Sequence, residues 1–394
     1  MKKQTIHDID LSGKRVLLRV DYNVQVIEGG VMDDTRLRES LPTIDTLRAA
    51  GARIVICSHR GRPRGEVVDA QRNAPVAAHL AGLLGAPVAT ADDCVGPAVQ
   101  AAVDALEPGG VLLLENVRFH LEEEENDPQF ARELASLADA YVSDAFGTAH
   151  RAHASLVGVP QHLPAVAGLL MEREIEALST VTHDPQRPFA LVLGGAKTQD
   201  KLPILDYLCE GADVICIGGG MANTFLVAAG HDVQDSLYEE GQVERARSIL
   251  EQVERRDDLD FLLPEDVVVS YGSPESGTTT VVPASEVPSG WRILDIGPGT
   301  IEKYARALKR ASTAVWNGPM GMFEQERFAH GSLGLARIFA TLDAITVIGG
   351  GETAAVVQRA GVTDFMGHVS TGGTAFMTML AGQPLPGVDA LLDS

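Results

Sequence analysis

Lysine is scarce in this chain, which contains seven lysines against twenty-five arginines. No lysine stands between Lys14 and Lys197, and the next one, Lys201, follows only four residues later. Arginine is a planar, permanently charged fork, whereas lysine is a compact charge on a flexible stem, so the two are not interchangeable. Where arginine fills nearly every cationic position, a lysine pair behind a glycine turn indicates a specific task.

Cysteine is rare as well, and the four cysteines form neither a CxxC pair nor a metal-ligand spacing. Most of them lie in or beside apolar runs, which favours buried free thiols in a reducing compartment. No apolar run reaches the length of a membrane span, and the first residues lack the apolar core of a signal peptide. We therefore expect a soluble, cytoplasmic protein with no membrane partner.

Positive charge is in deficit, because 54 acidic residues face 32 basic ones and the formal net charge is −22. This excess argues against nucleic acid as the main partner.

The chain also lacks a GxxxxGK[ST] loop and a GxGxxG fingerprint. A nicotinamide-dependent dehydrogenase is one alternative function, but the GxGxxG fingerprint expected of it is absent. A two-lobed binding protein for an anionic solute is a second alternative, and it would need the export signal that the sequence lacks.

Short apolar segments alternate with helical patterns along the whole chain. The segments are rich in β-branched residues and nearly free of polar ones, which is typical of parallel strands covered on both faces. Their alternation with helices predicts doubly wound α/β sheets. Strands are expected at residues 15–20, 53–58, 111–115, 140–143, 189–193, 214–217, 261–263, 313–316 and 345–348, and helices at 35–50, 76–84, 128–137, 239–255 and 301–309.

The length of 394 residues exceeds what one ordinary core supports. A strong helix-forming stretch at residues 168–178 follows a segment broken by Pro160 and Pro164. We expect this helix to join two Rossmann-like lobes with a cleft between them and to serve as a hinge. The predicted domains are residues 1–170 and residues 171–380, the second beginning with the connecting helix.

Polar side chains follow four predicted strands of the first half, at the points where those strands end. In open α/β sheets, ligands bind outside the carboxyl ends of the strands, so these side chains are expected to converge on one crevice. Arginine and histidine without lysine suit carboxylate and phosphate groups. One arginine at a strand end is usually a surface residue, but the pattern at four strand ends indicates an anion pocket. The set comprises Asp21, Asn23, Arg36, His59, Arg62, Arg118, His150 and Arg151.

Other polar positions receive plainer interpretations. Four consecutive glutamates, Glu122–Glu125, are interpreted as a solvated loop or the start of a helix. His7, His79 and His330 lack the strand-end setting. We interpret these three histidines as structural residues.

Three glycine groups follow predicted strands in the second half, at Gly194-Gly195, Gly218–Gly220 and Gly349–Gly351. A glycine turn before a helix lets backbone N–H groups approach a phosphate, and Lys197 beside the first turn would add charge. Each group can equally be an ordinary turn or a close contact between helix and strand. Glu352 at the start of a helix could hold Mg²⁺, or it could be a first-turn glutamate favoured by the helix dipole.

Eleven motifs stand in one order and cover essentially the whole chain. In the first half they are RVDYN (19–23), DDTR (33–36), SHRGRP (58–63), LLLENVRF (112–119) and DAFGTAHRAH (144–153). In the second half they are LGGAKTQDK (193–201), IGGGMANTF (217–225), LDIGP (294–298), VWNGPMGMFE (315–324), IGGGET (348–353) and HVSTGG (368–373). On these motifs the chain resembles the phosphoglycerate kinase family and is identified as a member of it.

The resemblance implies an activity, two substrates and a metal. It implies reversible phosphoryl transfer between 1,3-bisphosphoglycerate and ADP, giving 3-phosphoglycerate and ATP, with Mg²⁺. It implies a monomer whose lobes close before an in-line transfer. The first lobe would hold the glycerate, with the tail at residues 381–394 packing back on it, and the second lobe would hold the nucleotide.

The family's site residues are carried over by motif. The 3-phosphoglycerate would be bound by Asp21, Tyr22, Asn23, Arg36, His59, Arg60, Gly61, Arg62, Arg118 and Arg151. The nucleotide would be bound by Lys197, Lys201, Asn317, Glu324, Gly350, Gly351, Glu352 and Thr353, with Glu352 as the metal ligand. Arg36 and Lys197 would be the catalytic pair that steadies the transferring phosphoryl group.

Four positions depart from the family pattern. Arg60 stands where leucine is usual, and Gln25 replaces a proline. Glu352 stands where aspartate is commoner, and Thr374 replaces the third glycine of STGGG. None of these changes removes a charge that phosphoryl transfer needs.

Overall fold

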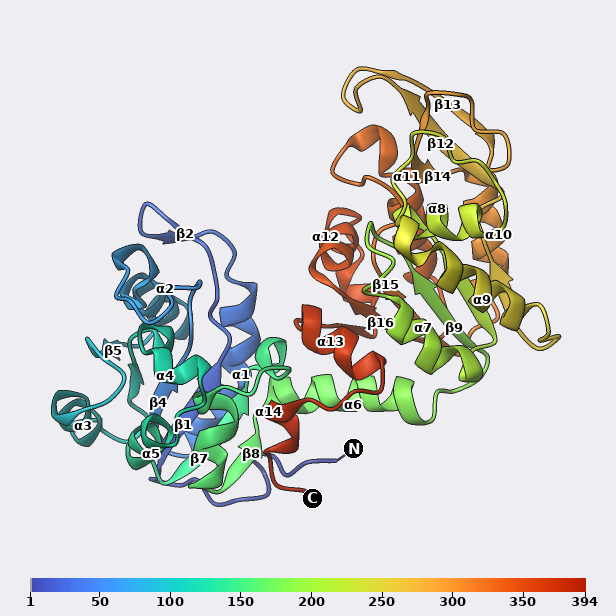
Figure 1. Ribbon diagram of the computed structural model, residues 1–394. Coiled ribbons are helices and arrows are strands. Elements are labelled where there is room, and N and C mark those ends of the chain that lie inside the picture. Colours follow the sequence, from blue (N-terminus) through green and yellow to red (C-terminus); the bar gives the residue numbers. More distant parts are fainter. Residues whose placement is uncertain (1) are drawn as a thin grey trace. The chain divides into compact units, whose positions relative to one another are not determined.

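The computed structural model describes residues 2–394, which form two compact units (Figure 1). The first unit contains residues 2–176 and Pro384–Ser394, and the second contains Ala177–Gln383. Helix α6 (Leu169–His183) runs from the first unit into the second, so the boundary lies inside the connecting helix. Two α/β units joined by a helix are the predicted fold class.

The first unit is built on one parallel sheet of six strands. Along the chain these are β1 (Arg15–Val20), β4 (Arg53–Cys57), β5 (Val88–Thr90), β6 (Val111–Leu113), β7 (Ala140–Asp144) and β8 (Ala165–Ala167). Across the sheet their order is β5-β6-β4-β1-β7-β8. The carboxyl ends of β4, β1 and β7 therefore lie side by side, as the anion-pocket prediction requires.

Helices cover both faces of this sheet. Val16, Leu18 and Val20 of β1 pack with two helices, α1 (Thr35–Ala49) and α2 (Ala74–Leu84), in one apolar cluster. Leu17 and Arg19 alternate with them, point to the other face and are buried too. The remaining helices of the unit are α3 (Pro97–Asp104), α4 (Leu121–Glu124), α5 (Pro128–Ser136) and the C-terminal α14 (Pro386–Asp389).

The second unit repeats this plan with another parallel sheet of six strands. The strands are β9 (Phe189–Leu193), β10 (Val214–Ile217), β11 (Asp260–Leu262), β15 (Thr313–Asn317), β16 (Ile345–Gly349) and β17 (His368–Val369), in the order β11-β10-β9-β15-β16-β17. The helices are α7 (Leu202–Leu208), α8 (Gly219–Ala228), α9 (Val243–Val253), α10 (Pro298–Leu308), α11 (His330–Phe339), α12 (Gly351–Arg359) and α13 (Gly373–Leu380). None of the helices within residues 2–394 is long and apolar enough to cross a membrane.

An antiparallel sheet in the second unit was not predicted. It consists of β12 (Asp266–Tyr271), β13 (Thr278–Pro283) and β14 (Arg292–Ile296), in the order β13-β12-β14. Threonines open β13 and its side chains are mostly exposed, so it lacks the apolar run that marks a buried strand. The first unit adds a small hairpin of β2 (Val26–Ile27) and β3 (Gly30–Val31), which is too short to leave a sequence pattern.

The end of the chain packs in the first unit, where Figure 1 shows the red α14 near the green β8. The N–H of Leu392 donates a hydrogen bond to the carbonyl of Ala165 at 3.0 Å, which is an ordinary backbone hydrogen-bond length. Lys3 donates to the Asp393 carboxylate at 2.7 Å, so the two chain ends are joined as well. The tail belongs to this unit from Pro384 onward, three residues later than the position predicted from the sequence.

Candidate active site

The ends of β1 and β4 and the start of α1 are tied together around Asp21. Its carboxylate pairs with Arg36 of α1, and its other oxygen lies 4.0 Å from Nδ1 of His59, which follows β4. The Oδ1 atom of Asn23 accepts a hydrogen bond of 2.9 Å from the N–H of Gly61. Five of the predicted substrate residues are therefore neighbours in the structure.

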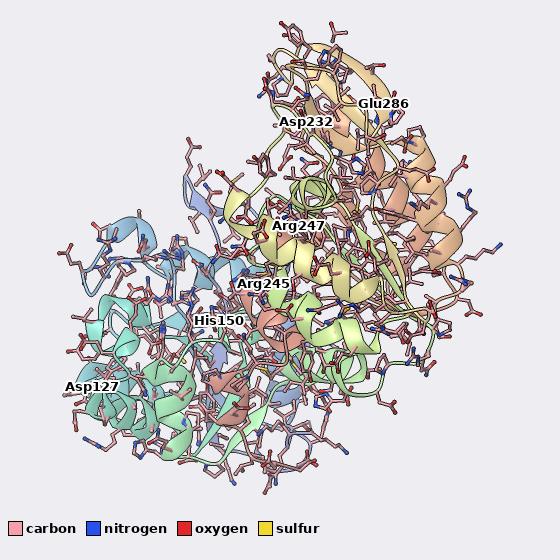
Figure 2. All side chains as sticks on the ribbon, turned by 45° about the vertical axis from the view of Figure 1, so that its right-hand side comes forward. Asp127, His150, Asp232, Arg245, Arg247 and Glu286 are labelled. Atoms are coloured by element: carbon pink, nitrogen blue, oxygen red, sulfur yellow. The ribbon has the colours of Figure 1, made fainter. Side chains whose placement is uncertain are left out.

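A second group of cations follows β7. The Nε of Arg151 donates to Nε2 of His150, which is labelled in Figure 2, at 3.2 Å. Burial lowers the pKa of the Arg151 guanidinium, and the nearby positive charge of Arg62 lowers it further. The Asp21 carboxylate has the opposite effect. The group therefore carries excess positive charge, and a bound anion would relieve that repulsion.

Arg118 shapes the loop that carries Arg62. It is almost fully buried, and its Nη1 donates to the carbonyl of Gly61 at 2.7 Å. Its Nε lies 3.2 Å from a carboxylate oxygen of Glu124. The Nη1 donor is thus used within the protein, and the residue stays a predicted ligand for its remaining donors.

Tyr22 and Arg60 have structural roles that the motif match did not predict. Tyr22 is fully buried and its hydroxyl lies 2.7 Å from that of Ser40, so its side chain faces the core rather than a ligand. The guanidinium of Arg60 donates to the carbonyls of Arg72 and, at 2.9 Å, of Ala70. This arginine, where the family usually has leucine, holds a neighbouring loop.

Two buried charged residues behind the predicted substrate residues were not predicted from the sequence. Arg19 at the end of β1 is 1% exposed, and Glu123 is fully buried although its neighbours in the glutamate run are exposed. The run does start a helix, α4, as one of the two interpretations held, but Glu123 is not solvated. Glu123 lies three residues after His120 on a short helix, and this spacing alone does not predict which glutamate side chain of the helix is buried.

The second unit contains a cavity of about 360 Å³. Its walls are mainly apolar, and Glu324 and Glu352 both line it. A slot of this kind suits a flat aromatic base, with a carboxylate available for hydroxyl groups. Its apolar walls come from Leu237, Val267, Ile293, Met320 and Met322, which the sequence reasoning did not name.

The first two glycine groups act by close packing. The N–H groups of Gly194 and Gly195 donate to the carbonyls of Asn317 and Pro319, at 2.9 and 2.7 Å. A Cβ on Gly194 would lie 2.3 Å from the Pro319 oxygen, and one on Gly219 would lie 2.6 Å from the Gly195 nitrogen. Of the two alternatives for this group, close packing rather than a phosphate contact therefore holds for the N–H groups of Gly194 and Gly195, because both donate within the protein.

The third glycine group opens α12, which begins at Gly351. Gly350 has φ +91°, a conformation that favours glycine. Asn317 donates to the carbonyl of Gly349 at 2.8 Å, and the Thr353 hydroxyl accepts from the N–H of Gly318 at 2.7 Å. The first-turn N–H groups of a helix have no partner within the helix, so this turn offers donors to an anion.

Oxygen donors at this turn fit a magnesium ion. The buried Oδ1 of Asn317 has no hydrogen-bond partner within residues 2–394. Glu352 adds a carboxylate in the first turn of α12. Mg²⁺ prefers oxygen ligands of this type, so the donor set is compatible with the predicted metal.

The two lysines differ in their surroundings. Lys197 is exposed in the loop after β9, and α7 begins only at Leu202. Lys201 is mostly buried, with Nζ 3.4 Å from the Met377 sulfur. Burial lowers the pKa of the Lys201 ammonium, and the carboxylates of Asp200 and Glu352 counteract this. Lys201 therefore lies close enough to Glu352, the predicted metal ligand, to feel its charge. The exposed side chain of Lys197 can reach a bound substrate.

All four cysteines are free and three of them are buried, as predicted. Cys94 forms a group with Asp93 and His120 in which the possible metal-ligand atoms lie within 4.8 Å of one another, an arrangement that sequence spacing did not reveal. The Nε2 of His120 is already 2.6 Å from a carboxylate oxygen of Asp93, and its ring stacks on Phe130. The imidazole is thus held by contacts within the protein.

The fold and these groups of residues define a class of protein. One unit gathers arginine and histidine side chains suited to a small anion, and the other presents an apolar cavity beside a helix N-terminus, lysines and a carboxylate. An enzyme with these two sets of groups is a kinase that acts on a small anionic substrate.

Comparison with known proteins gives the family. The sequence model of the family described as phosphoglycerate kinase matches residues 6–383. The phosphoglycerate kinase of Moorella thermoacetica is 52% identical over 393 residues, with 100% of each chain covered. That of Roseiflexus castenholzii is 49% identical over 396 residues, again with 100% of each chain covered.

Two solved structures agree. Phosphoglycerate kinase from Coxiella burnetii has a TM-score of 0.90 at 38% identity, and that from Pyrococcus horikoshii has a TM-score of 0.86 at 34% identity. Each comparison covers 98% of both chains. The chain belongs to the phosphoglycerate kinase family, and it is accordingly a kinase of glycolysis.

Proposed function

We propose that the protein transfers a phosphoryl group from 1,3-bisphosphoglycerate to ADP, and in reverse from ATP to 3-phosphoglycerate, with Mg²⁺. The single observation that carries the residue assignment is the clustering of five residues at the ends of β1 and β4 and the start of α1, namely Asp21, Asn23, Arg36, His59 and Gly61. This cluster supports a binding site for the three-carbon anion. Arg62, Arg118 and Arg151 complete the proposed site.

The nucleotide is proposed to bind in the second unit. The apolar cavity would take the base, and Glu324 would accept hydrogen bonds from ribose hydroxyls. The phosphates would lie at the N-terminus of α12, formed by Gly350, Gly351 and Thr353, within reach of Lys197 and Lys201. Glu352, with Asn317 beside it, would hold Mg²⁺, which neutralises charge on the phosphate oxygens when bound.

The chemistry needs positioned charge rather than a base. In the forward direction an oxygen of ADP forms the new P–O bond, and the bond to the acyl oxygen breaks to leave a carboxylate. Both the nucleophile and the leaving group are anions, so no proton has to move. Lys197 and Arg36 are proposed to stabilise the transferring group, because interactions made mainly in the transition state accelerate the step.

The proposed ligands belong to different compact units, so transfer requires the two bound substrates to be brought together. We propose that closure is favoured only when both are present, because a ligand shifts a conformational equilibrium only through its differential affinity for the two states. Small-angle scattering should then show a larger compaction with both ligands than the sum of the single-ligand changes. An equal radius of gyration in all four ligand states would refute closure and leave the kinase assignment intact.

We further propose that the protein acts as a monomer, because one chain supplies every residue of both proposed sites. A cytoplasmic location stays a prediction from the sequence.

The proposed reaction is tested by mixing the purified protein with ATP, Mg²⁺ and 3-phosphoglycerate. Formation of 1,3-bisphosphoglycerate is followed by coupling it to glyceraldehyde-3-phosphate dehydrogenase and NADH oxidation. We expect turnover that requires all three components. A protein that binds 3-phosphoglycerate without consuming ATP would instead be a binding protein, and the proposal would be wrong.

A further inference from the structure

A buried chain of polar groups lies behind the substrate residues of the first unit. Both carboxylate oxygens of Glu123 accept hydrogen bonds from Ser155, one from its N–H at 2.8 Å and one from its hydroxyl at 2.7 Å. The same hydroxyl oxygen accepts from Nε of Arg19 at 2.8 Å. A serine hydroxyl has a single proton, so it can donate to Glu123 while accepting from Arg19.

This chain connects a buried carboxyl group to a buried guanidinium through one hydroxyl group. Arg19 is 1% exposed, and Glu123 and Ser155 are both fully buried. A buried charge is costly unless it is paired and hydrogen-bonded, so removal of the carboxylate leaves Arg19 without its counter-charge. Nη1 of Arg19 also donates to the carbonyl of Val20, which fixes the guanidinium at the end of β1.

The fixed guanidinium determines where His59 carries its proton. Nη2 of Arg19 lies 3.3 Å from Nδ1 of His59. A guanidinium can only donate, so Nδ1 must accept and cannot carry a proton. The neutral ring then has its proton on Nε2, at the far edge of the imidazole.

The surroundings of His59 favour the neutral ring. It is 2% exposed, and burial is the largest cause that lowers its pKa. The positive charges of Arg19, Arg151 and Arg36 lower the pKa further, in that order, and His153 adds to them. The Asp21 carboxylate faces the ring at 4.0 Å, on the Nδ1 side.

We propose that Glu123 and Ser155 are positioning residues that act through Arg19 to hold His59 as the neutral tautomer with its proton on Nε2. This inference rests on the proposed function, because the Nε2–H group then donates a hydrogen bond to an anionic oxygen of the three-carbon substrate. Neither Glu123 nor Ser155 touches the substrate. Their effect is to keep one donor of the site in the required form before the substrate arrives.

The tautomer is read first in the wild-type protein by ¹H–¹⁵N correlation spectra of ¹⁵N-histidine-labelled enzyme. His59 is identified among the eleven histidines by the signals lost in His59→Gln. We expect an unprotonated Nδ1 and a protonated Nε2 at neutral pH without substrate. A proton on Nδ1, or on both nitrogens, would overturn the proposal whatever the variants do.

The network is then broken by Glu123→Gln, with Glu122→Gln as the matched control. The two glutamates are adjacent in α4, but Glu122 is exposed and Glu123 is buried. Glu123→Gln should change the His59 signals and raise KM for 3-phosphoglycerate by roughly tenfold, as loss of a hydrogen bond to a charged group implies. KM for ATP should be unchanged, and Glu122→Gln should match the wild type in every respect.

Ser155→Ala removes only the bridging hydroxyl and serves if Glu123→Gln fails to fold. It should shift the His59 signals and KM in the same direction. A raised KM with unchanged His59 signals would overturn the proposal, since the effect would then be merely structural, and so would unchanged KM in a folded variant. If the wild type has the expected tautomer but no phosphoryl transfer, the proposed function fails while the tautomer assignment stands.

Discussion

Two buried aspartates make the stability of this protein dependent on pH. Asp144 accepts hydrogen bonds from the N–H groups of Leu170 and Met171 at the start of α6, at 2.9 and 3.1 Å. Asp295 accepts from the N–H of Gly331 at 2.8 Å in the wall of the second-unit cavity. Burial raises the pKa of each carboxyl group to about 7, and the hydrogen bonds offset only part of this.

We predict that Asp144→Asn gains stability relative to the wild type as pH rises from 4 to 7. The unfolded chain releases this proton near its usual pKa of 3.8, whereas the folded protein keeps it until about 7. The folded state thus binds more protons in this window, and the free energy of unfolding falls as pH rises. The full change is at most roughly 4 kcal/mol.

Urea unfolding of both proteins at several pH values measures this difference. Asp343→Asn is the control, because Asp343 is exposed in the loop after α11. If the wild-type and Asp144→Asn curves stay parallel from pH 4 to pH 8, the carboxyl group of Asp144 is not the cause.

Lys197 provides a prediction at the proposed transfer step. Lys197→Ala should lower kcat by roughly a hundredfold, while the dissociation constant for ATP changes little. The reason is that an exposed lysine beside the proposed phosphate site meets charge that shifts during transfer. Steady-state kinetics and equilibrium binding measure the two quantities, with Lys309→Ala on the exposed end of α10 as the control. A variant with near-normal kcat would remove Lys197 from the mechanism.

At the residue scale, the motifs predicted which residues lie close together better than they predicted the role of each side chain. Asp21, Asn23 and His59 do lie together, because they follow adjacent parallel strands. Tyr22 sits between two of these residues in sequence, but its side chain alternates to the core. Glu123 was interpreted as a surface residue but is buried. Which side chain of a charged run is buried depends on tertiary packing, and no local sequence pattern predicts it.

At the scale of elements, close approach between loops explains why the glycines after β9 and β10 cannot carry side chains. A Cβ at Gly194 would lie 2.3 Å from a backbone oxygen of the loop after β15, and one at Gly218 would lie 2.3 Å from the sulfur of Met320. Backbone atoms cannot move aside as a flexible side chain can. The loops that frame the cavity of the second unit are therefore joined through glycine contacts.

Gly194→Ala is predicted to lower the melting temperature by roughly 5 °C, because overpacking of this kind costs about 1–3 kcal/mol. Binding of ATP should weaken as well, since the displaced loop borders the cavity. Gly211→Ala is the control, because a Cβ there meets nothing within 4 Å. Differential scanning calorimetry and ATP titration measure the two effects, and equal melting temperatures for the two variants would contradict the packing argument.

The strands that were predicted share one property, which is a continuous apolar run. β1, β9 and β10 match their predicted ranges because β9 and β10 are apolar throughout and β1 contains the apolar run Val16–Leu18 between Arg15 and Arg19. The three-residue β5 and β8 and the two-residue β17 were missed, although β6 and β11, which also have three residues, were predicted. The long helix expected at 239–255 begins only at Val243, after a 3₁₀ turn over Glu240–Gln242.

For the whole molecule, the resemblance and the alternation of strands and helices were enough to predict two α/β units. The exact division was not accessible, because α6 is one continuous helix and its sequence contains no signal at the boundary between Glu176 and Ala177. The tail was placed by resemblance alone, and its contacts with Ala165 and Ala149 come from backbone groups that any residue offers.

Each substrate is proposed to be held by a different unit. Hydrogen–deuterium exchange with mass spectrometry tests it most directly, in the free protein, with 3-phosphoglycerate, and with a non-hydrolysable ATP analogue and Mg²⁺. We predict that 3-phosphoglycerate alone slows exchange in peptides covering residues 19–23, 58–63, 118–120 and 148–153. The analogue alone should slow exchange at residues 194–201, 317–324 and 349–355. Protection by 3-phosphoglycerate confined to the second unit, or by the analogue confined to the first, would contradict the account.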